Sequence, residues 1–228
     1  MWEDLQRNYP PIQDKAAVLA LDRLLYRLCN SNGIDTAGLH RHLIHNPEVN
    51  AFALPGRRLV IHSGLIRNAQ GPDEVAGVLA HELAHSELGH IRQKLIKEAG
   101  LTLLMAWISG NLGFENNVIH EMARVLSSTA FDRKYESEAD RCAVEYLKKA
   151  GVNPNGLAKF MDRLAKNESA GPIPMEWLST HPASAKRAQY IRQSAGLSDS
   201  TQYQISLEPE SWKALQNAAL PQQTQQTQ

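Results

Sequence analysis

Residues 81–85 read His-Glu-Leu-Ala-His, a spacing that can build a metal site within about one helical turn. Four residues make slightly more than one turn, so His81 and His85 project from the same helix face toward a common point. Glu82 borders that point without having to bind the metal itself. Two neutral imidazoles suit zinc, and a catalytic zinc site needs three protein ligands and an open position for water. The spacing therefore predicts hydrolysis, with Glu82 as the general base for a zinc-activated water.

This short pattern also arises by coincidence on amphipathic helices, so the hypothesis needs a third ligand. A metzincin would carry glycine at position 88 and histidine at position 91, whereas this chain has Leu88 and Ile91, which excludes that class. A glutamate on a second helix is the other pattern, and Glu136 and Asp140 share a helix face four residues apart. If Glu136 is the ligand, Asp140 can accept the free N–H of a ligating histidine, which we expect to be His81.

The remaining acidic and imidazole side chains have simpler interpretations. Glu138 lies on a different face of the same helix and is expected to face solvent. His90 follows the motif by five positions and is interpreted as a structural hydrogen-bonding residue. His62 and His120 are isolated, which indicates surface positions. The histidines at positions 40, 42 and 45 alternate along a predicted strand, which places the third on the opposite face and argues against a second metal site.

The elements that must position these residues follow from periodicity and turn residues. Apolar residues recur at helical spacing over residues 12–29. Strand-like runs at 42–44, 51–54 and 58–62 follow, within a β-like stretch that reaches residue 66, and Pro55-Gly56 predicts a hairpin turn between the last two. Long helices are expected over 72–99 and 117–150, shorter ones over 154–165 and 180–194, and a glycine-interrupted helix over 100–115. A small sheet among dominant helices indicates the α+β fold class.

Composition bounds the domain organisation and the partners. The chain has 228 residues, and Lys plus Arg and Asp plus Glu each total 24, so the formal net charge is zero. That balance argues against nucleic-acid binding. Cys29 and Cys142 lie too far apart in sequence to suggest a disulfide framework or a cysteine metal site. We expect one metallopeptidase domain over residues 1–195 and a C-terminal extension over 196–228, whose glutamine-rich end from residue 220 is typical of a disordered segment.

The cellular compartment stays open at this stage. Residues 1–11 are polar and lack the apolar core of a signal peptide. The longest apolar stretch, residues 101–108, is shorter than the roughly 20 residues that cross a bilayer, but it is suited to peripheral contact with a membrane surface or to covering a groove. The chain is therefore expected in the cytoplasm if it is complete, and in the periplasm or cell envelope if a signal was trimmed.

Four blocks of the chain occur in a characteristic order. They are Asn50-Ala51-Phe52-Ala53-Leu54-Pro55-Gly56, the His81 to His85 motif, residues 135–140, and His181-Pro182 followed by Arg187. In these blocks the chain resembles the gluzincin family that includes the CAAX prenyl proteases and HtpX, metallopeptidase family forty-eight. Its likeness is greatest to the soluble periplasmic members of the BepA and LoiP type.

The resemblance implies a zinc endopeptidase on a zincin-like α+β scaffold, mostly helical, with a small antiparallel or mixed sheet beside the motif helix. It assigns one zinc ion per chain to His81, His85 and Glu136, and the general base to Glu82. It also implies that the block from position 50 forms a sheet edge on which an extended substrate adds as a strand. The candidate substrate-binding residues at this edge are Asn50, Ala51 and Phe52. A turn-forming residue is the alternative interpretation of Asn50.

His181 has two functional interpretations within this family. Pro182 is expected to fix it at a helix start, where the helix dipole disfavours the protonated imidazole. In relatives, the matching histidine either stabilises the oxyanion of the transition state or binds zinc as a fourth, inhibitory ligand. Arg187 is expected to hold this loop through a buried ion pair or carbonyl contacts.

Two residues depart from the family pattern near the site. Asp132 stands where relatives commonly carry serine before the arginine that corresponds to Arg133, and Arg57 replaces a second glycine after Pro55-Gly56. These changes affect the expected substrate preference rather than metal binding. The transmembrane helices of the prenyl proteases and HtpX are absent from the sequence, which weakens the case for prenyl-protein processing.

The sequence therefore predicts a zinc endopeptidase that cleaves unfolded, misfolded or membrane-associated polypeptides in protein quality control. Two alternatives remain: a zinc-binding, chaperone-like or assembly module with little proteolysis, and a zinc hydrolase that acts on other substrates. The residue pattern does not define the natural substrate or the oligomeric state.

Overall fold

The structure, a computed structural model, describes residues 9–98, 130–167, 176–182, 185–196 and 203–221. Its sheet has three strands, β1 (His40–Ile44), β2 (Ala51–Leu54) and β3 (Arg58–His62), in the order β1-β3-β2. β1 runs parallel to β3, and β2 pairs antiparallel with β3, with Phe52 opposite Val60. Both the predicted hairpin and the predicted α+β class, with a small mixed sheet among helices, are confirmed.

The turn of this hairpin requires an unusual backbone conformation. Gly56 and Arg57 both have positive φ angles, 77° and 57°. Among the described residues, Arg57 is the only residue other than glycine with a positive φ. A left-handed residue other than glycine carries a steric cost, which makes Arg57 an unfavourable residue for this turn. The Arg57 guanidinium lies 3.3 Å from the Glu87 carboxylate and so connects the turn to the motif helix.

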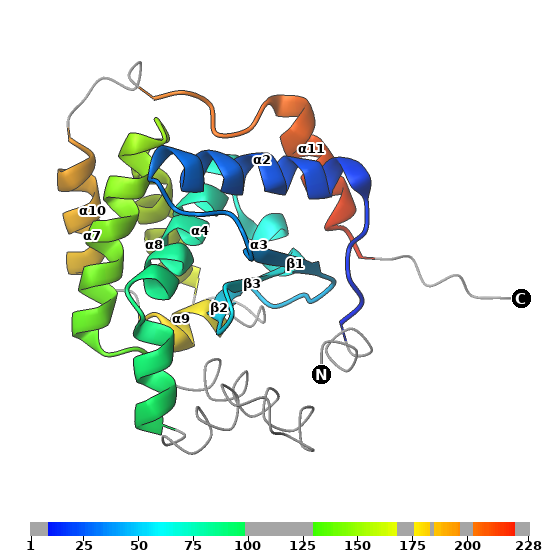
Figure 1. The fold of residues 1–228 in the computed structure, drawn as a ribbon. Helices are drawn as coiled ribbons and strands as arrows, with labels where there is room; N and C mark the ends of the chain where they lie inside the picture. Colours follow the sequence, from blue (N-terminus) through cyan, green and yellow to red (C-terminus); the bar gives the residue numbers. More distant parts are fainter. Residues whose placement is uncertain (1–8, 99–129, 168–175, 183–184, 197–202, 222–228) are drawn as a thin grey trace, which may run out of the picture.

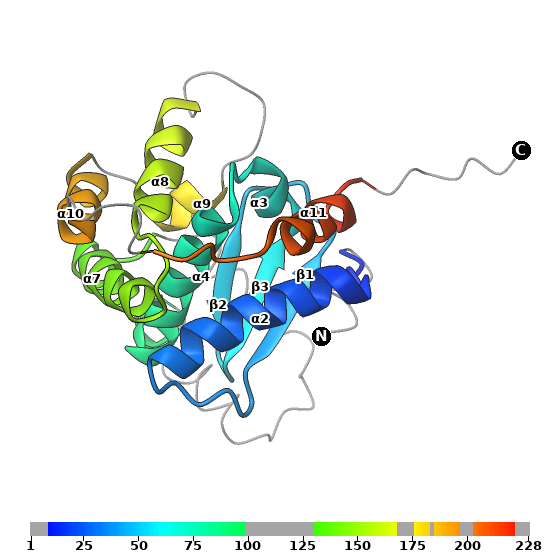
Figure 2. The same ribbon diagram turned by 90° about the horizontal axis from the view of Figure 1, so that it is seen from above.

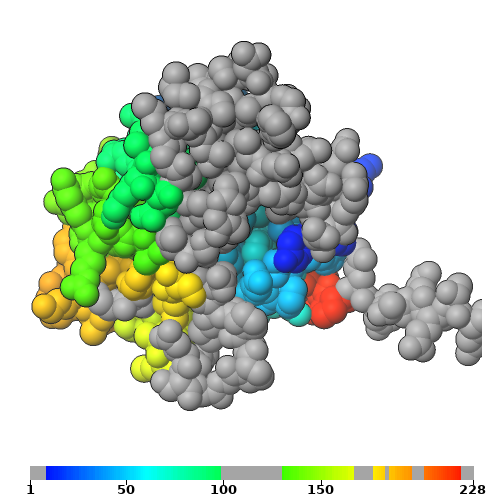
Figure 3. All heavy atoms as spheres, turned by 90° about the horizontal axis from the view of Figure 1, so that it is seen from below, coloured from blue at the N-terminus to red at the C-terminus, as the bar shows by residue number. Residues whose placement is uncertain are grey.

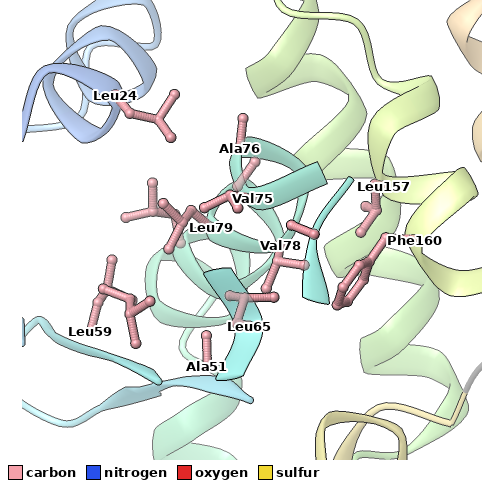
Figure 4. Packing of buried hydrophobic residues seen from close by; sticks show 14 of the residues in the cluster. Leu24, Ala51, Leu59, Leu65, Val75, Ala76, Val78, Leu79, Leu157 and Phe160 are labelled. Atoms are coloured by element: carbon pink, nitrogen blue, oxygen red, sulfur yellow. The ribbon is translucent and has the colours of Figure 1, made fainter. Parts of the chain in front are cut away.

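Two helices cover one face of the sheet. α2 (Lys15–Ser31) begins at Asp14, whose carboxylate accepts a hydrogen bond from the Ala17 N–H, and it lies across the strands (Figure 2). α4 (Pro72–Glu87) follows the short helix α3 (Ser63–Asn68), which replaces the β-like continuation expected after residue 62. In Figure 4, side chains from α2, α4 and the sheet, including Leu24, Leu79 and Leu59, meet in one apolar core.

The motif helix is shorter than predicted. α4 ends at Glu87, and helical structure resumes over residues 90–98 instead of running unbroken to position 99. Gly89 has a φ of 72°, and its N–H bonds to the Ser86 carbonyl. Glycine adopts this left-handed conformation without a side-chain clash and therefore ends the helix.

The next helices along the chain pack against α4 or against one another (Figure 1), and some begin later than predicted. α7 (Arg133–Lys149) begins at residue 133, since residues 130–132 are not helical, and residues 117–129 of the helix predicted over 117–150 lie outside the described residues. α8 (Asn155–Asn167) follows. The helix expected over 180–194 corresponds to α10 (Ala185–Ala195), which begins later than predicted, and a short helix that was not predicted, α9 (Glu176–Thr180), precedes it. The segments predicted around residues 100–115 and 220–228 lie mostly or wholly outside the described residues.

The C-terminal part adds a helix that the sequence analysis did not predict. α11 (Pro209–Ala218) packs on α2 and buries Leu215 completely. Arg27 of α2 reinforces this arrangement by donating to the carbonyls of Ala150, 2.7 Å away, and Ile205, 2.7 Å away. No helix in the described part of the chain is both long and apolar enough to span a bilayer.

The two ends of the described chain lie at the same edge of the molecule. Ile12 donates its N–H to the Leu43 carbonyl at 2.8 Å, so the segment before α2 pairs with the outer side of β1. In the space-filling view, blue atoms of this segment lie beside red atoms of the α11 region (Figure 3). Residues 11–14, His45 and residues from the end of α11 line a cavity of about 490 Å³ there.

Candidate metal centre

α4 contributes three buried polar side chains to one point in the molecule. His81, Glu82 and His85 are at most 1% exposed, although the helix around them is otherwise apolar. The Nε2 atoms of the two histidines lie 3.1 Å apart, as expected for residues one turn apart on one face. Acidic residues in the first turn and Pro72 at its start favour the helix at its amino end.

Glu136 reaches the same point from the first turn of α7, which packs against α4. Its Oε1 lies 3.2 Å from His85 Nε2, and its Oε2 lies 3.6 Å from His81 Nε2. The carboxylate is only 2% exposed. The structure thus brings together the three residues that the sequence analysis proposed as ligands.

His181 joins them from the loop after α9. Its Nδ1 lies 3.0 Å from Glu136 Oε1 and 3.3 Å from His81 Nε2, while its Nε2 lies 3.3 Å from Glu82 Oε1. The expectation that it stands at a helix start is wrong, because its N–H bonds to the Trp177 carbonyl at the end of α9. The carbonyl end of a helix favours a cation, so the dipole argument for a neutral imidazole does not apply.

The donor set fits a divalent transition metal. One ligand atom from each of His81, His85, Glu136 and His181 lies within 4.8 Å of all the others, and all four residues are buried. Separations of 3.0–3.6 Å between donor atoms resemble those around a tetrahedral zinc ion, where ligands about 2.0–2.1 Å from the metal lie roughly 3.4 Å apart. Among the described residues no second group of this kind occurs.

Asp140 and Arg187 hold the metal-site side chains from behind. Asp140 Oδ1 lies 3.1 Å from His81 Nδ1, on the ring nitrogen opposite the metal-facing one. Arg187 donates two hydrogen bonds to the Asp140 carboxylate, at 2.6 and 2.8 Å. Its Nη1 also lies 2.6 Å from Glu136 Oε2 and 2.8 Å from the Pro182 carbonyl oxygen. One guanidinium therefore connects a ligand carboxylate, the carboxylate behind His81, and the loop that carries His181.

His85 has a supporting chain of its own. His90 Nδ1 lies 3.2 Å from His85 Nδ1, and His90 Nε2 lies 3.2 Å from Glu138 Oε2. The sequence analysis placed Glu138 in solvent, but its side chain is 30% exposed and reaches back to His90. The helix break at Gly89 makes this contact possible, because it returns the next residue toward the site.

The ionisation of the site follows from burial and close partners. Burial raises the pKa of Glu136, but His181, His81 and His85 outweigh it and hold that pKa well below its usual range. Burial lowers the pKa of His81, yet hydrogen bonds that its ring donates to the Asp140 and Glu136 carboxylates raise it to about 9. Burial holds the pKa of His85 well below its ordinary value. Metal binding would displace a proton from His81, since a ligating imidazole must be neutral.

Several side chains in the site have no local sequence signal. Trp177 is fully buried, and its indole N–H donates to Glu82 Oε1 at 3.1 Å. The Phe131 ring stacks on His181 with a centroid distance of 5.2 Å. Lys94 Nζ lies 3.9 Å from the centre of that ring, and burial lowers the lysine pKa to about 8. The one feature of the sequence that could have placed Trp177 in the site is its position four residues before His181, on a short helix.

The proposed substrate strand lies next to this centre. Among the described residues β2 pairs with no strand other than β3, so its other side is an edge of the described sheet. The carbonyl of Val49 accepts the Trp177 N–H at 3.1 Å, which places the start of the strand against α9. Asn50 is 1% exposed, and its Oδ1 has no hydrogen-bond partner among the described residues. Ala51 is buried, at 1% exposure.

Phe52 packs edge-on against His62 rather than against the metal-site residues. The surface position expected for His62 is wrong, because its side chain is 5% exposed between Phe52 and Tyr9. Burial lowers its pKa to about 4. His120 lies outside the described residues.

Comparison with known proteins gives consistent matches. The family described as peptidase family M48 matches residues 17–195. The mitochondrial metalloendopeptidase OMA1 of Schizosaccharomyces pombe is 28% identical over 175 residues, 77% of this chain and 52% of that protein. The beta-barrel assembly-enhancing protease of Escherichia coli is 29% identical over 207 residues, 84% of this chain and 41% of that protein. Metalloprotease LoiP of the same species is 32% identical over 149 residues, 64% of this chain and 58% of that protein.

The chain thus spans about half the length of the curated relatives it matches. The family match begins within α2 and ends with α10, so it includes both helices that contribute to the metal centre and the loop with His181. Two of these relatives are named as a metalloendopeptidase and a metalloprotease, and the buried donor set of this chain fits a metal. The chain belongs to peptidase family M48.

Proposed function

We propose that this protein is a zinc endopeptidase in which His81, His85 and Glu136 hold the metal and Glu82 is the general base. The observation that supports it most is the convergence of these three donors in a buried site with a second carboxylate, that of Glu82, beside them. Glu82 Oε2 is buried and has no hydrogen-bond partner among the described residues, so one oxygen of the base is available to a water molecule.

Zinc bound there would polarise the attacking water and the scissile carbonyl. Glu82 would accept the proton of the water and then donate it to the leaving amine. Asp140 would hold His81 as a metal ligand through its Nδ1–H, and Arg187 would keep both carboxylates of α7 in place. The atoms that Asp140 and Arg187 would use for these roles already lie at contact distance from His81 and from the carboxylates of α7.

The substrates of a peptidase are polypeptides, and we propose that this one takes extended segments of unfolded, misfolded or membrane-associated proteins. The support is the edge of β2 that has no strand partner in the described part of the chain, since its backbone can pair with a substrate strand. The name of one relative, a beta-barrel assembly-enhancing protease, is consistent with work on proteins that fail to assemble. Only extended chains can add to a sheet edge, so folded proteins should resist cleavage.

The position of His181 supports a role for this residue in controlling access of water to the metal. Its Nδ1 lies among the metal donors, in the geometry of a fourth ligand, while its Nε2 faces Glu82. If it occupies the position that water needs, His181→Ala should raise basal cleavage. If it stabilises the oxyanion of the transition state, cleavage should fall instead.

The first experiment measures metal content by mass spectrometry and cleavage of casein for wild type and Glu82→Gln together. One zinc in each protein and cleavage by wild type alone supports the proposal. Equal cleavage by both proteins would contradict the role of Glu82. Well-folded protein without zinc would overturn the metal assignment.

A chaperone-like module with little proteolysis is the alternative. It predicts that wild type and Glu82→Gln protect an unfolded protein from aggregation equally and that neither cleaves it. A buried carboxylate with a free oxygen beside the metal donors favours the enzyme, since binding alone requires no base there.

A further inference from the structure

Trp177 makes a polar contact that the proposed mechanism has not used. The indole is fully buried, and its Nε1–H donates to Glu82 Oε1 at 3.1 Å. A buried tryptophan N–H needs an acceptor. Here the acceptor is the carboxylate that would act as general base, and a hydrogen bond to a charged group is among the stronger ones in proteins.

Because of this contact, the two carboxylate oxygens of Glu82 have different surroundings. Oε1 accepts from Trp177 and lies 3.3 Å from His181 Nε2, whereas Oε2 is buried without a hydrogen-bond partner among the described residues. A glutamate side chain has several rotatable bonds, so a carboxylate without a partner samples many orientations. Fixing Oε1 restricts these and leaves Oε2 as the oxygen that can take a proton.

Trp177 is itself held from several sides. Its backbone N–H donates to the Val49 carbonyl at 3.1 Å, directly before β2. Its ring stacks on His181 with a centroid distance of 5.1 Å and an interplanar angle of 25°. The edge of Phe160 packs against it with a centroid distance of 5.6 Å. The donor therefore has a fixed position relative to both the substrate strand and the metal site.

We propose that Trp177 is a positioning residue, which orients the Glu82 carboxylate through its indole N–H and ties that orientation to the start of the substrate strand. The proposal rests on Glu82 being the general base. A correctly placed base supports reaction more than it supports substrate binding. Loss of the N–H should therefore lower kcat and leave KM nearly unchanged.

The test compares Trp177→Phe with Trp212→Phe. The first keeps an aromatic ring in the site and removes the N–H, and the second makes the same change in α11. We expect kcat of Trp177→Phe to fall about 10- to 100-fold, with KM within about threefold of wild type and one zinc retained. Trp212→Phe should keep the wild-type kcat. Wild-type kcat in Trp177→Phe, or a rise in KM that accounts for the whole loss, would overturn the proposal.

A second measurement does not depend on activity. The chain has four tryptophans, so its ¹⁵N-labelled indole N–H signals are few, and the signal that remains unchanged when each of the other three is replaced by phenylalanine belongs to Trp177. In Glu82→Gln the Trp177 signal should move upfield, because a neutral amide is a weaker acceptor than a carboxylate, while that of Trp212 stays in place. An unmoved Trp177 signal would show that the hydrogen bond is absent and would refute the positioning role even if Trp177→Phe failed to fold.

The two measurements separate this proposal from the proposed function. If wild type cleaves nothing but the indole signal moves, the contact exists and the assignment of Glu82 as a base fails, and with it the positioning role. If wild type cleaves, Glu82→Gln does not, and Trp177→Phe is fully active, the base assignment stands and the role of Trp177 is wrong.

Discussion

Asp140 lies behind His81, where it influences the metal without touching it. Its carboxylate accepts from Arg187 and lies 3.1 Å from His81 Nδ1, so it favours the tautomer in which His81 Nε2 is free to bind metal. Burial raises the pKa of Asp140, but the hydrogen bonds from Arg187 lower it below its ordinary value. The residue is therefore a buried anion held by a buried cation.

Asp140→Asn should weaken zinc binding about 10- to 100-fold, because the amide loses the charge that orients and polarises His81. Competition with a chromogenic chelator measures the affinity. Asp162→Asn is the matched control, since Asp162 forms an exposed ion pair with Arg192 on neighbouring helices. Equal affinities for wild type and Asp140→Asn would contradict the assignment of Asp140 as the partner of His81.

His62 should make folding stability depend on pH. Burial lowers its pKa from 6.5 to about 4, so the unfolded chain takes up a proton below pH 6.5 while the folded protein does not until about pH 4. The free energy of unfolding must then decrease as pH falls from 6.5 to 4, by up to about 3 kcal/mol from this residue. Urea unfolding at several pH values should show a shallower decrease for His62→Asn. All other titratable groups are common to both proteins, so a parallel decrease in the two would exclude this origin.

At the scale of elements, the contact between α4 and α8 depends on small residues. A Cβ on Gly77 would lie 2.7 Å from Leu157 Cβ and 2.9 Å from its backbone nitrogen. The two helices approach this closely because Gly77 has no side chain to separate them. The metal motif, residues 81–85, follows one turn later on α4. Any shift of α4 away from α8 would also move His81 and His85 relative to α7.

Gly77→Ala should reduce the free energy of unfolding by about 1–3 kcal/mol, because the backbone of α8 must move to admit the methyl group. Gly71→Ala is the control: it has open space around its Cβ position, and the loss of a glycine N-cap should cost at most about 1 kcal/mol. Chemical denaturation measures both. An unchanged stability for Gly77→Ala would show that the helices separate without cost.

How far the sequence predicted the molecule depends on whether the relevant signal was local. The strands were predicted well because their alternation and the Pro55-Gly56 turn are local features. Glu136 was proposed as the third ligand because it lies on a second predicted helix, downstream of the histidine motif. The end of α4 at Glu87 was missed although Gly89 gave a signal, because the apolar pattern continues past it. The Trp177 contact with Glu82 joins residues 95 positions apart, and no periodicity records such a pair.

At the scale of the whole molecule, the last described helix packs against the first. α11 packs on α2, so segments nearly two hundred residues apart share one apolar contact, and Arg27 holds the chain that leads to it. The weak pattern after residue 196 gave no sign of this, because α11 is short and buries one side chain, Leu215, completely.

Leu215→Ala tests whether α11 unfolds together with the metal-binding helices. If the two form one cooperative unit, the substitution should lower the free energy of the whole transition by about 2–5 kcal/mol, as for other buried leucines. Lys213→Ala changes an exposed position on the same helix and should cost little. A main transition that stays in place while α11 alone loses hydrogen-exchange protection would show that residues after 196 form a separable extension.

The placement of residues 11–14 beside the end of α11 has a consequence for how this unit combines with other sequences. Both ends of the described chain lie near β1, whereas the free edge of the sheet belongs to β2 at its opposite side. A unit with neighbouring ends can be inserted into a host loop or joined to flanking domains by short connections. Sequence added at either end would start from the side of the sheet away from β2, so a fused domain would not have to cross the strand that is proposed to receive substrate.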